Sequence, residues 1–181
     1  GNHYQWGRPA DGHEITVWDG ATPTNGRGFA DATALEALAT SDTPGHPNFI
    51  LTDVTPYDWR SNNNNNRWAT ANQGPCPVGY HVPTNTEWNT ADAFNGGAAT
   101  NGGTTVGWDN NTETYNSALK LPSAGHRYRS IGVLSGPGTG GAYWSSTVDG
   151  TNARSLTFGS TAARTSYDYR AYGFSVRCLK N

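Results

Sequence analysis

The stretch GYHVPTNTEW, residues 79–88, predicts more local structure than any other ten residues of the chain. Its first residues read as a short strand, which Pro83 ends. The residues TNTE that follow form a capping box, because the Thr84 hydroxyl can accept from the N–H of Glu87 while the Glu87 carboxylate reaches back to the N–H of Thr84. We therefore expect a helix that begins at Thr84 and buries Trp88, and we assign Glu87 to the cap rather than to catalysis.

Other regular elements are predicted on both sides of this stretch. DATALEALAT (31–40) has Ala34, Leu35 and Leu38 at helical spacing, with Asp31 as an N-cap. Four segments combine β-forming residues with flanking turn residues and are predicted strands: HYQWG (3–7), AYWSST (142–147), ARSLTFG (153–159) and GFSVRCLK (173–180).

Two segments show little periodicity. SNNNNNRW (61–68) favours turns over helix or strand and is predicted to be a surface loop. Residues 95–142 form a stretch whose length is rare for a structureless loop in a compact domain. Loops of that length are usually functional, so we expect the site in residues 95–142 and in the following turn at 147–152.

The composition indicates one extracellular domain spanning residues 1–181. Only 34% of the residues are hydrophobic and 14% are charged, yet 7 Trp, 9 Tyr and 5 Phe provide a core of large rings. The net charge is −2 and basic residues do not cluster, which argues against a nucleic-acid partner. No apolar run approaches the roughly 20 residues of a membrane helix. With no Met and no signal peptide, we expect a domain cut from a longer protein.

The two cysteines, Cys76 and Cys178, admit two interpretations. They are either buried thiols or a disulfide that closes a loop of roughly 100 residues. The extracellular composition favours the disulfide. Their separation excludes a CxxC redox motif and a cysteine-rich zinc site.

Three segments with acidic and amide side chains are candidates for calcium, which takes about six to eight oxygen ligands. The first segment, 108–116, offers four such residues: Asp109, Asn110, Asn111 and Glu113. The second, 147–152, offers Asp149 and Asn152 directly after a predicted strand, and the third, 8–14, offers Asp11 and Glu14. None has the spacing of an EF-hand, and ordinary turn formation explains the same residues as well.

The segment RTSYDYRAYGF (164–174) is the richest in aromatic and cationic residues, and we interpret it as a binding surface. In an extended chain Tyr167 and Tyr169 share one face. Arg127 and Arg170 can pair with a ligand carboxylate in a bidentate geometry. The alternative is that the tyrosines cover the core edge and the arginines form surface ion pairs.

The tryptophans divide in the same way between core and site. Trp6 and Trp144 are expected in the core. Trp108, between Gly107 and Asp109 in the irregular stretch, is harder to explain as core and is a candidate pocket wall.

Motifs for catalysis are missing from the sequence. The five histidines, at positions 3, 13, 46, 81 and 126, show no zinc-hydrolase spacing, and His81 fits a framework role. No GxSxG, P-loop or GxGxxG motif occurs. GPGTGG (136–141) lacks the Lys-Ser/Thr of a phosphate loop, so we predict a flexible loop there.

Five landmarks in this order resemble the Fibrobacter succinogenes major paralogous domain, a C-type-lectin-like relative of the formylglycine-generating-enzyme fold. They are YQWGR (4–8), CPVGYHVPTNTEW (76–88), LKLPSAGHR (119–127), GGAYWSST (140–147) and YGFSVRCLK (172–180). Three further segments are similar to the peptide-binding domain of RTX adhesins of Gram-negative marine bacteria: GNHYQWGRPADGHE (1–14), PGHPNFI (44–50) and the DW…NRW segment (58–68).

This resemblance implies an α+β, C-type-lectin-like fold: a twisted, mainly antiparallel sheet with two helices and a long irregular loop region. The two ends of the chain would lie in neighbouring strands. A Cys76–Cys178 bridge would then tie the strand before the second helix to the last strand.

The resemblance also implies calcium-dependent capture of a peptide by its free C-terminal end, on a host or neighbouring cell. A calcium-dependent lectin and a purely structural spacer are the alternatives. Enzymes related to this fold use an exposed reactive cysteine, whereas both cysteines here are best explained as structural. We therefore expect a binding module at the bacterial cell surface and no enzymatic activity.

Overall fold

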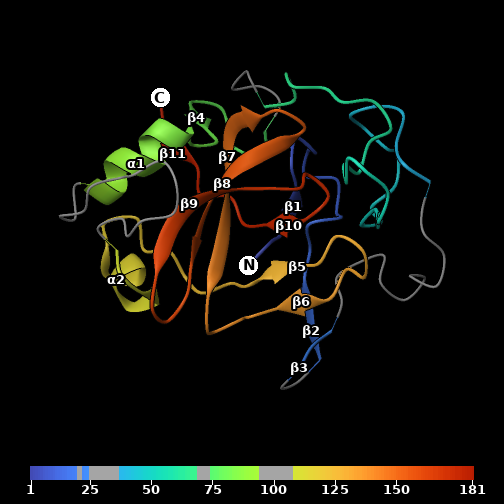
Figure 1. Ribbon diagram of the computed structural model, residues 1–181. Coiled ribbons are helices and arrows are strands. Elements are labelled where there is room, and N and C mark those ends of the chain that lie inside the picture. The colour runs from blue at the N-terminus through green and yellow to red at the C-terminus, as the bar shows by residue number, and fades with distance from the viewer. Residues whose placement is uncertain (20–21, 25–36, 69–73, 94–107) are drawn as a thin grey trace.

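The computed structural model describes residues 1–19, 22–24, 37–68, 74–93 and 108–181, and these ranges contain two helices and eleven short strands (Figure 1). The helices are α1 (Asn85–Ala93) and α2 (Asn111–Asn116). The strands are β1 (Tyr4–Gln5), β2 (Val17–Asp19), β3 (Thr22–Thr24), β4 (Tyr80–His81), β5 (His126–Arg127), β6 (Leu134–Ser135), β7 (Gly141–Asp149), β8 (Asn152–Phe158), β9 (Ala163–Asp168), β10 (Gly173–Phe174) and β11 (Leu179–Lys180). All pairings between these strands are antiparallel, so the described chain is an α+β structure. Neither helix has the length and apolar character needed to cross a bilayer.

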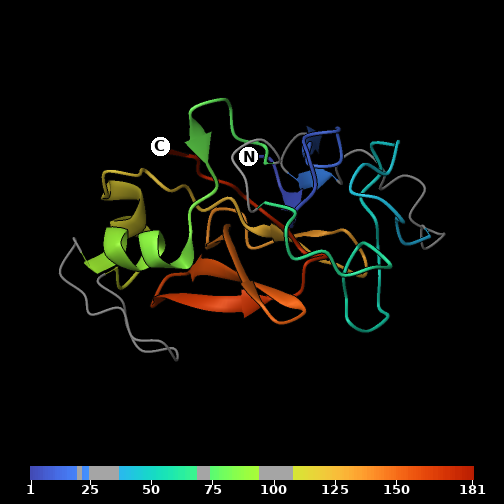
Figure 2. The same ribbon diagram turned by 90° about the horizontal axis from the view of Figure 1, so that it is seen from above.

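The sheet with the longest strands is the meander β7–β8–β9. Gly150 adopts a left-handed backbone (φ 58°) in the two-residue turn between β7 and β8, where a side chain would be strained. Alternation along β8 divides its side chains between two faces. Leu156 and Phe158 join a buried cluster with Trp88 and Leu121, beside which α1 and α2 lie (Figures 1 and 2).

The opposite face of this meander packs on a second, smaller sheet of order β1–β10–β5–β6. Trp144 of β7 stacks on Phe174 of β10, with ring centroids 4.2 Å apart, and Trp6 packs in the same cluster. Both Trp6 and Trp144 are fully buried, as the sequence predicts.

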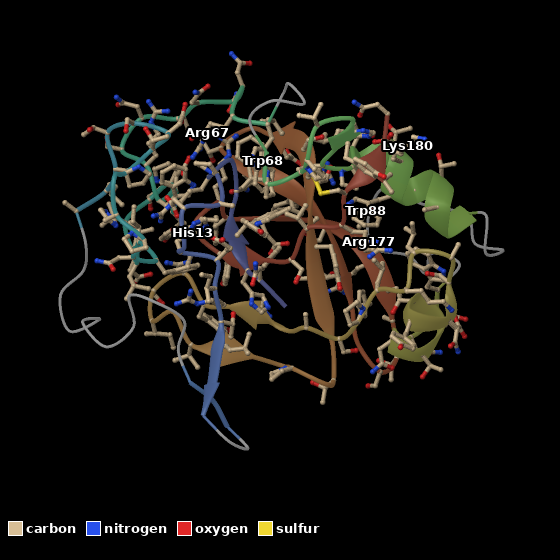
Figure 3. All side chains as sticks on the ribbon, turned by 180° about the vertical axis from the view of Figure 1, so that it is seen from behind. His13, Arg67, Trp68, Trp88, Arg177 and Lys180 are labelled. Carbon is tan, nitrogen blue, oxygen red and sulfur yellow. A yellow bond between two sulfur atoms is a disulfide. The ribbon has the colours of Figure 1, made fainter. Side chains whose placement is uncertain are left out.

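The two ends of the chain pair with each other, as expected. Tyr4 of β1 lies opposite Phe174 of β10, and His81 of β4 lies opposite Leu179 of β11. Cys76 and Cys178 form a disulfide beside the β4–β11 pair (Figure 3). The predicted strand over 173–180 is interrupted, and only its two ends are strands, β10 and β11.

The capping box before α1 is confirmed in both directions. The N–H of Thr84 donates to Glu87 Oε2 (2.8 Å), and the N–H of Glu87 donates to Thr84 Oγ1 (3.2 Å). Glu87 Oε1 also accepts from the ring N–H of His81 Nε2 at 2.9 Å, which agrees with a framework role for both residues. Trp88 is fully buried.

The other predictions of regular structure are only partly met. Residues 31–36 of the predicted 31–40 helix lie outside the described ranges, and residues 37–40 are not helical, because Ala39 instead forms a bridge with Arg60. The described part of the irregular stretch, 108–142, holds α2, β5, β6 and the start of β7, so it is less irregular than predicted.

The segment 37–68 contains neither helix nor strand and lies on the side of the molecule away from the two helices (Figures 1 and 2). A group that we call the arginine–tryptophan stack anchors it. Arg67 lies over both Trp6 and Trp59, at 5.2 and 5.0 Å from the ring centroids. Arg170 lies over Trp6 at 4.5 Å, and Arg8 over Trp59 at 5.6 Å. Cations over ring faces are attracted by the ring quadrupole, so the stack joins this segment to both ends of the chain.

Candidate ligand-binding groove

A hollow of about 560 Å³ opens between the face of β8–β9 and the smaller sheet. Its far wall consists of His126, Tyr172 and the glycine-rich loop 136–141. That loop ends at Gly141, where a Cβ atom would meet the Phe158 ring at 2.6 Å, so only glycine permits this close packing. The segment predicted to be a flexible loop is therefore one wall of this hollow.

One face of β9 supplies the polar side of this hollow. Arg164, Ser166 and Asp168 alternate along β9 and all three line the hollow, together with Thr157 of β8. Arg164 is exposed, and within the described residues its guanidinium group has no hydrogen bond or ion pair. Asp168 lies four positions after Arg164 along β9, so their Cα atoms are about 13 Å apart. A cationic group and a carboxylate thus line the same hollow from two positions along β9.

Asp168 has one engaged and one open oxygen. Its Oδ2 accepts from the buried Ser155 hydroxyl, whereas its Oδ1 has no partner among the described residues. Burial raises the pKa of Asp168 above its ordinary value, although the Ser155 hydrogen bond and the charge of Arg164 act in the opposite direction. The open oxygen can accept a hydrogen bond from a ligand.

A continuous line of rings, which we call the aromatic row, extends from this hollow. It consists of His126, Tyr128, Tyr172, Tyr169 and Tyr57, with neighbouring centroids 4.5–6.3 Å apart. Tyr128 and Tyr169 are 41% and 37% exposed, so the row presents apolar ring surface to solvent. Exposed tyrosines with polar tips are typical of binding surfaces. The hollow and the row together form the candidate site, which we call the groove.

Tyr57, at the end of the aromatic row, has a strained backbone. Its φ of 62° lies in the left-handed region, which a bulky residue rarely adopts. Hydrogen bonds hold it there, from its own N–H to the Val54 carbonyl (2.8 Å) and from the Ala171 N–H to its carbonyl (3.1 Å). Arg129 covers its ring at 4.0 Å. Such outliers concentrate at functional sites, which supports the groove as a site.

The two arginines that the sequence proposed as carboxylate partners lie inside the protein. Arg127 is 1% exposed and donates to the carbonyls of Gly132 and His13 at 3.0 and 2.9 Å. Burial lowers its pKa to about 10. Arg170 is fully buried and donates to Asn63, Asn65 and the carbonyls of the β7–β8 turn. Both guanidinium groups support the groove from behind and do not line it.

The remaining sequence candidates for ligand binding divide between groove and core. Tyr169 lies in the aromatic row. Tyr167 is 60% exposed but faces away from the hollow, next to Arg154. Trp108 lies three positions before the start of α2, is 1% exposed and packs in the core with Trp88 and Leu121.

The first predicted calcium segment folds into α2 and uses its oxygens for the helix start. Asn110 is the N-cap, and its side-chain oxygen accepts from the N–H groups of Thr112 and Glu113. Glu113 Oε2 accepts from the Asp109 N–H (2.6 Å), and its Oε1 accepts from the Asn110 amide (3.0 Å). Asn111 donates to the Thr139 carbonyl at 3.4 Å. These oxygens face N–H donors, and they do not form a calcium cage.

The second predicted calcium segment, the β7–β8 turn, is surrounded by cations. Asp149 pairs with Arg154 at 2.7 Å, and the carbonyls of Gly150 and Asn152 accept from Arg170. Two guanidinium groups beside these oxygens would repel a divalent cation. The described geometry of this turn does not fit calcium either.

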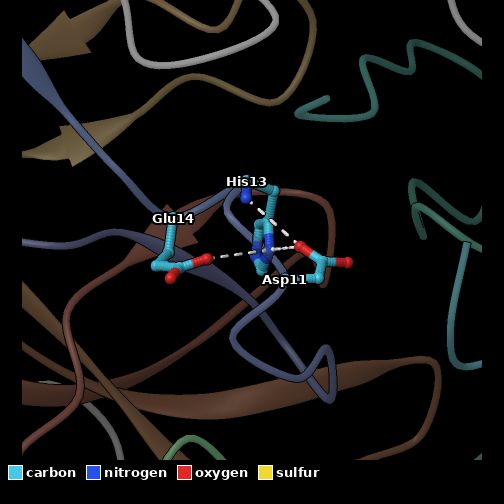
Figure 4. A group of neighbouring side chains, drawn as sticks. All are labelled: Asp11, His13 and Glu14. Atoms are coloured by element: carbon cyan, nitrogen blue, oxygen red, sulfur yellow. Dashed lines mark hydrogen bonds and ion pairs between the residues drawn. The ribbon is translucent and has the colours of Figure 1, made fainter. Parts of the chain in front are cut away.

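The third segment is the one group of acidic and histidine ligands within reach of one another in the described chain: Asp11, His13 and Glu14 (Figure 4). His13 Nδ1 donates to Asp11 (2.6 Å), and its Nε2 accepts from the Gln5 N–H (3.0 Å). Arg8 donates to the other Asp11 oxygen at 2.8 Å. Internal partners thus occupy these atoms, and the group serves as an internal hydrogen-bond network.

The residues that carry the groove were mostly missed by sequence reasoning. Arg164, Asp168, Tyr172 and His126 were not selected, although the alternation in RTSYD (164–168) places every second residue on one face. That alternation was used to group Tyr167 with Tyr169. The even-numbered residues of the same segment, which include Arg164 and Asp168, share the opposite face.

Comparison with known proteins gives one match. A family model described as a domain of unknown function (DUF8237) matches residues 105–179, from just before α2 into β11. The match therefore includes β5 to β10 and most of the groove, but less than half of the chain. No curated protein and no solved structure matches the chain.

Proposed function

We propose that this chain is a non-catalytic ligand-binding module of an extracellular bacterial adhesin, and that the groove holds the free C-terminal end of a peptide. One observation carries the proposal: the exposed Arg164 and the carboxylate of Asp168 both line one hollow beside the aromatic row. A peptide end carries a carboxylate, backbone N–H donors and side chains that pack on rings. Those three groups complement Arg164, Asp168 and the tyrosines respectively.

The dimensions of the groove agree with a short peptide end. Arg164 and Asp168 are about 13 Å apart along β9, which is the length of roughly four extended residues. Arg164 is free to pair with a carboxylate, whereas the buried Arg127 and Arg170 are committed to internal acceptors. The disulfide and the C-type-lectin-like resemblance support an extracellular setting.

Peptide binding is expected to depend on the free carboxylate and on Arg164. Amidating the C-terminus of a binding peptide, or the substitution Arg164→Gln, should weaken binding about 10- to 100-fold, because a charge-assisted hydrogen bond is lost. Isothermal titration calorimetry with a library of free-ended peptides and their amides measures this. Lys180→Gln, at the exposed end of β11, is the matched control and should leave affinity unchanged. Equal affinity for free and amidated peptides would overturn the carboxylate assignment.

A carbohydrate is the second candidate ligand. Tyr172 and His126 border the same hollow as Thr157, Ser166 and Asp168, and rings beside hydroxyl and carboxylate groups are suited to sugar recognition. Competition by simple sugars for peptide binding would favour this candidate. A glycan array without hits at high protein concentration would remove it.

Calcium dependence is the part of the proposal that rests on the resemblance alone. Millimolar calcium, the range of extracellular modules, is expected to raise the melting temperature above that in chelator. Because Asp149 and Glu113 already have partners, Asp149→Asn and Glu113→Gln should leave this response unchanged. Equal melting temperatures in both buffers would remove calcium from the proposal. If either variant loses the calcium-dependent rise in melting temperature, calcium binds at the substituted segment.

A further inference from the structure

We infer that the Asp168 end of the groove binds a positively charged group of the ligand, such as a lysine side chain. This inference deepens the proposed function and rests on it, because it assigns a preferred residue type to the peptide that the groove holds. Nothing in the peptide-end proposal requires it, since backbone N–H groups alone would satisfy Asp168.

Asp168 differs in its ion pairing from other carboxylates of the protein. Three neighbouring carboxylates each contact a cation of the protein: Asp53 contacts Arg129, Asp149 contacts Arg154 and Asp58 contacts Arg67. Asp168 is partly buried and forms no ion pair with any cation in the described part of the chain. A carboxylate withdrawn from water without a cationic partner is costly, and a cation supplied by the ligand removes that cost.

Two aromatic rings line the hollow together with this carboxylate. Tyr172 and His126 line the same hollow as Asp168, with ring centroids 6.0 Å apart. Burial raises the pKa of the Tyr172 hydroxyl, and the charge of Asp168 acts in the same direction, which places the two groups within electrostatic reach. Ring faces attract ammonium and guanidinium groups. A carboxylate beside ring faces is therefore the combination that recognises a cation.

The spacing between Arg164 and Asp168 suits a ligand that carries both a carboxylate and a lysine. A lysine ammonium extends about 6 Å from its Cα, so a lysine two or three residues before the terminal carboxylate can reach Asp168 while the carboxylate meets Arg164. Arg164 is the protein cation whose charge acts on Asp168, but the two form no ion pair. Arg129 is held by Asp53 and the Thr52 carbonyl, and Arg170 by the turn carbonyls. The expected ligand therefore carries opposite charges near its end.

Four N-acetylated tetrapeptides test this inference on the unmodified protein. They carry lysine or uncharged norleucine at the second position and end in either a carboxylate or an amide. Lysine is expected to bind about 10-fold or more tightly than norleucine in calorimetry at low salt, and the difference should shrink as salt is added. Equal binding of the lysine and norleucine peptides overturns the inference. Equal binding of acids and amides overturns the carboxylate part of the proposed function instead.

A variant and a simpler probe complete the test. Asp168→Asn should abolish the preference for lysine while the preference for a free carboxylate persists, and Asp42→Asn, outside the hollow, should change neither. If no peptide binds, Nα-acetyl-lysine methylamide, which keeps its side-chain ammonium group, is titrated while the carboxyl ¹³C signal of Asp168 is followed by NMR. A shift of that signal with lysine but not with the norleucine analogue supports the inference. Absence of such a shift overturns it.

Discussion

Replacing Asp58 with alanine is expected to lower the free energy of unfolding by about 3–5 kcal/mol. Asp58 is 1% exposed and pairs through both oxygens with the equally buried Arg67. The guanidinium group of Arg170 also approaches it, at 3.7 Å. Removing the carboxylate leaves two guanidinium groups inside the protein without their anion. The tryptophan rings beneath them compensate only in part, because a cation–π contact contributes about 0.5–2 kcal/mol.

Urea denaturation of the purified domain measures this loss. Asp53→Ala is the matched control, since the Asp53 side chain is 70% exposed and its pair with Arg129 is screened by solvent. We expect the control to cost less than about 1 kcal/mol. If Asp58→Ala costs no more than the control, the buried pair does not stabilise the fold in the way described.

Asp58→Ala should also weaken ligand binding. A substitution that disturbed only the surroundings of Asp58 would leave binding unchanged. Arg170 lies between Tyr169 and Tyr172 in the chain, and its hydrogen bonds to the Asn loop and the β7–β8 turn hold that segment in place. Loss of the Asp58 charge loosens Arg170 and, with it, the aromatic row. Binding to the groove is therefore expected to fall in Asp58→Ala at temperatures where the protein is still folded.

The sequence predicts the local elements better than the site because their signals are short-range. The Thr84–Glu87 capping box involves residues three apart, and it forms as expected. The pairing of β1 with β10 joins residues about 170 apart and followed only from the resemblance. The groove depends on such long-range pairing, because His126 and Asp168 belong to different sheets and line the same hollow.

The arginines show why residue type alone misplaced the binding groups. Arg127, Arg164 and Arg170 are chemically equivalent in the sequence, and only packing distinguishes them. Arg127 and Arg170 are buried and bound to internal carbonyls, whereas Arg164 is exposed at the hollow. The Asn run at 61–68 gave no sign of its role either, yet Asn63 and Asn65 bind the Arg170 guanidinium group.

Acidification from pH 7 to pH 4.5 is expected to lower the free energy of unfolding by about 5 kcal/mol, largely through His3 and His13. Both are fully buried and neutral. His3 Nε2 donates to the Ala124 carbonyl (3.0 Å) and its Nδ1 accepts from Thr16, while His13 Nε2 accepts from the Gln5 N–H. Burial lowers the pKa of His3 from 6.5 to about 3 and that of His13 to about 4.

The direction of this change in stability depends on which state, folded or unfolded, binds more protons. Between pH 6.5 and about 4 the unfolded chain protonates both histidines and the folded protein does not, so stability is present above pH 6.5 and is lost as the pH falls. Each histidine contributes about 2–3 kcal/mol over this range. Asp168 and His81, whose pKa values the fold raises, act in the opposite direction, but both are partly exposed and contribute less.

Urea denaturation at the two pH values, with one substitution and one control, tests the assignment to these histidines. His13→Gln keeps an acceptor for the Gln5 N–H and removes the titrating ring, so the loss between pH 7 and pH 4.5 should shrink by about half. His46→Gln, in a half-buried loop position, should leave the loss unchanged. A wild-type change below about 1 kcal/mol would contradict the neutral, buried state of the two rings. An unchanged loss in His13→Gln would instead assign the acid sensitivity to other groups, because the ring that hydrogen-bonds Asp11 would not be its source.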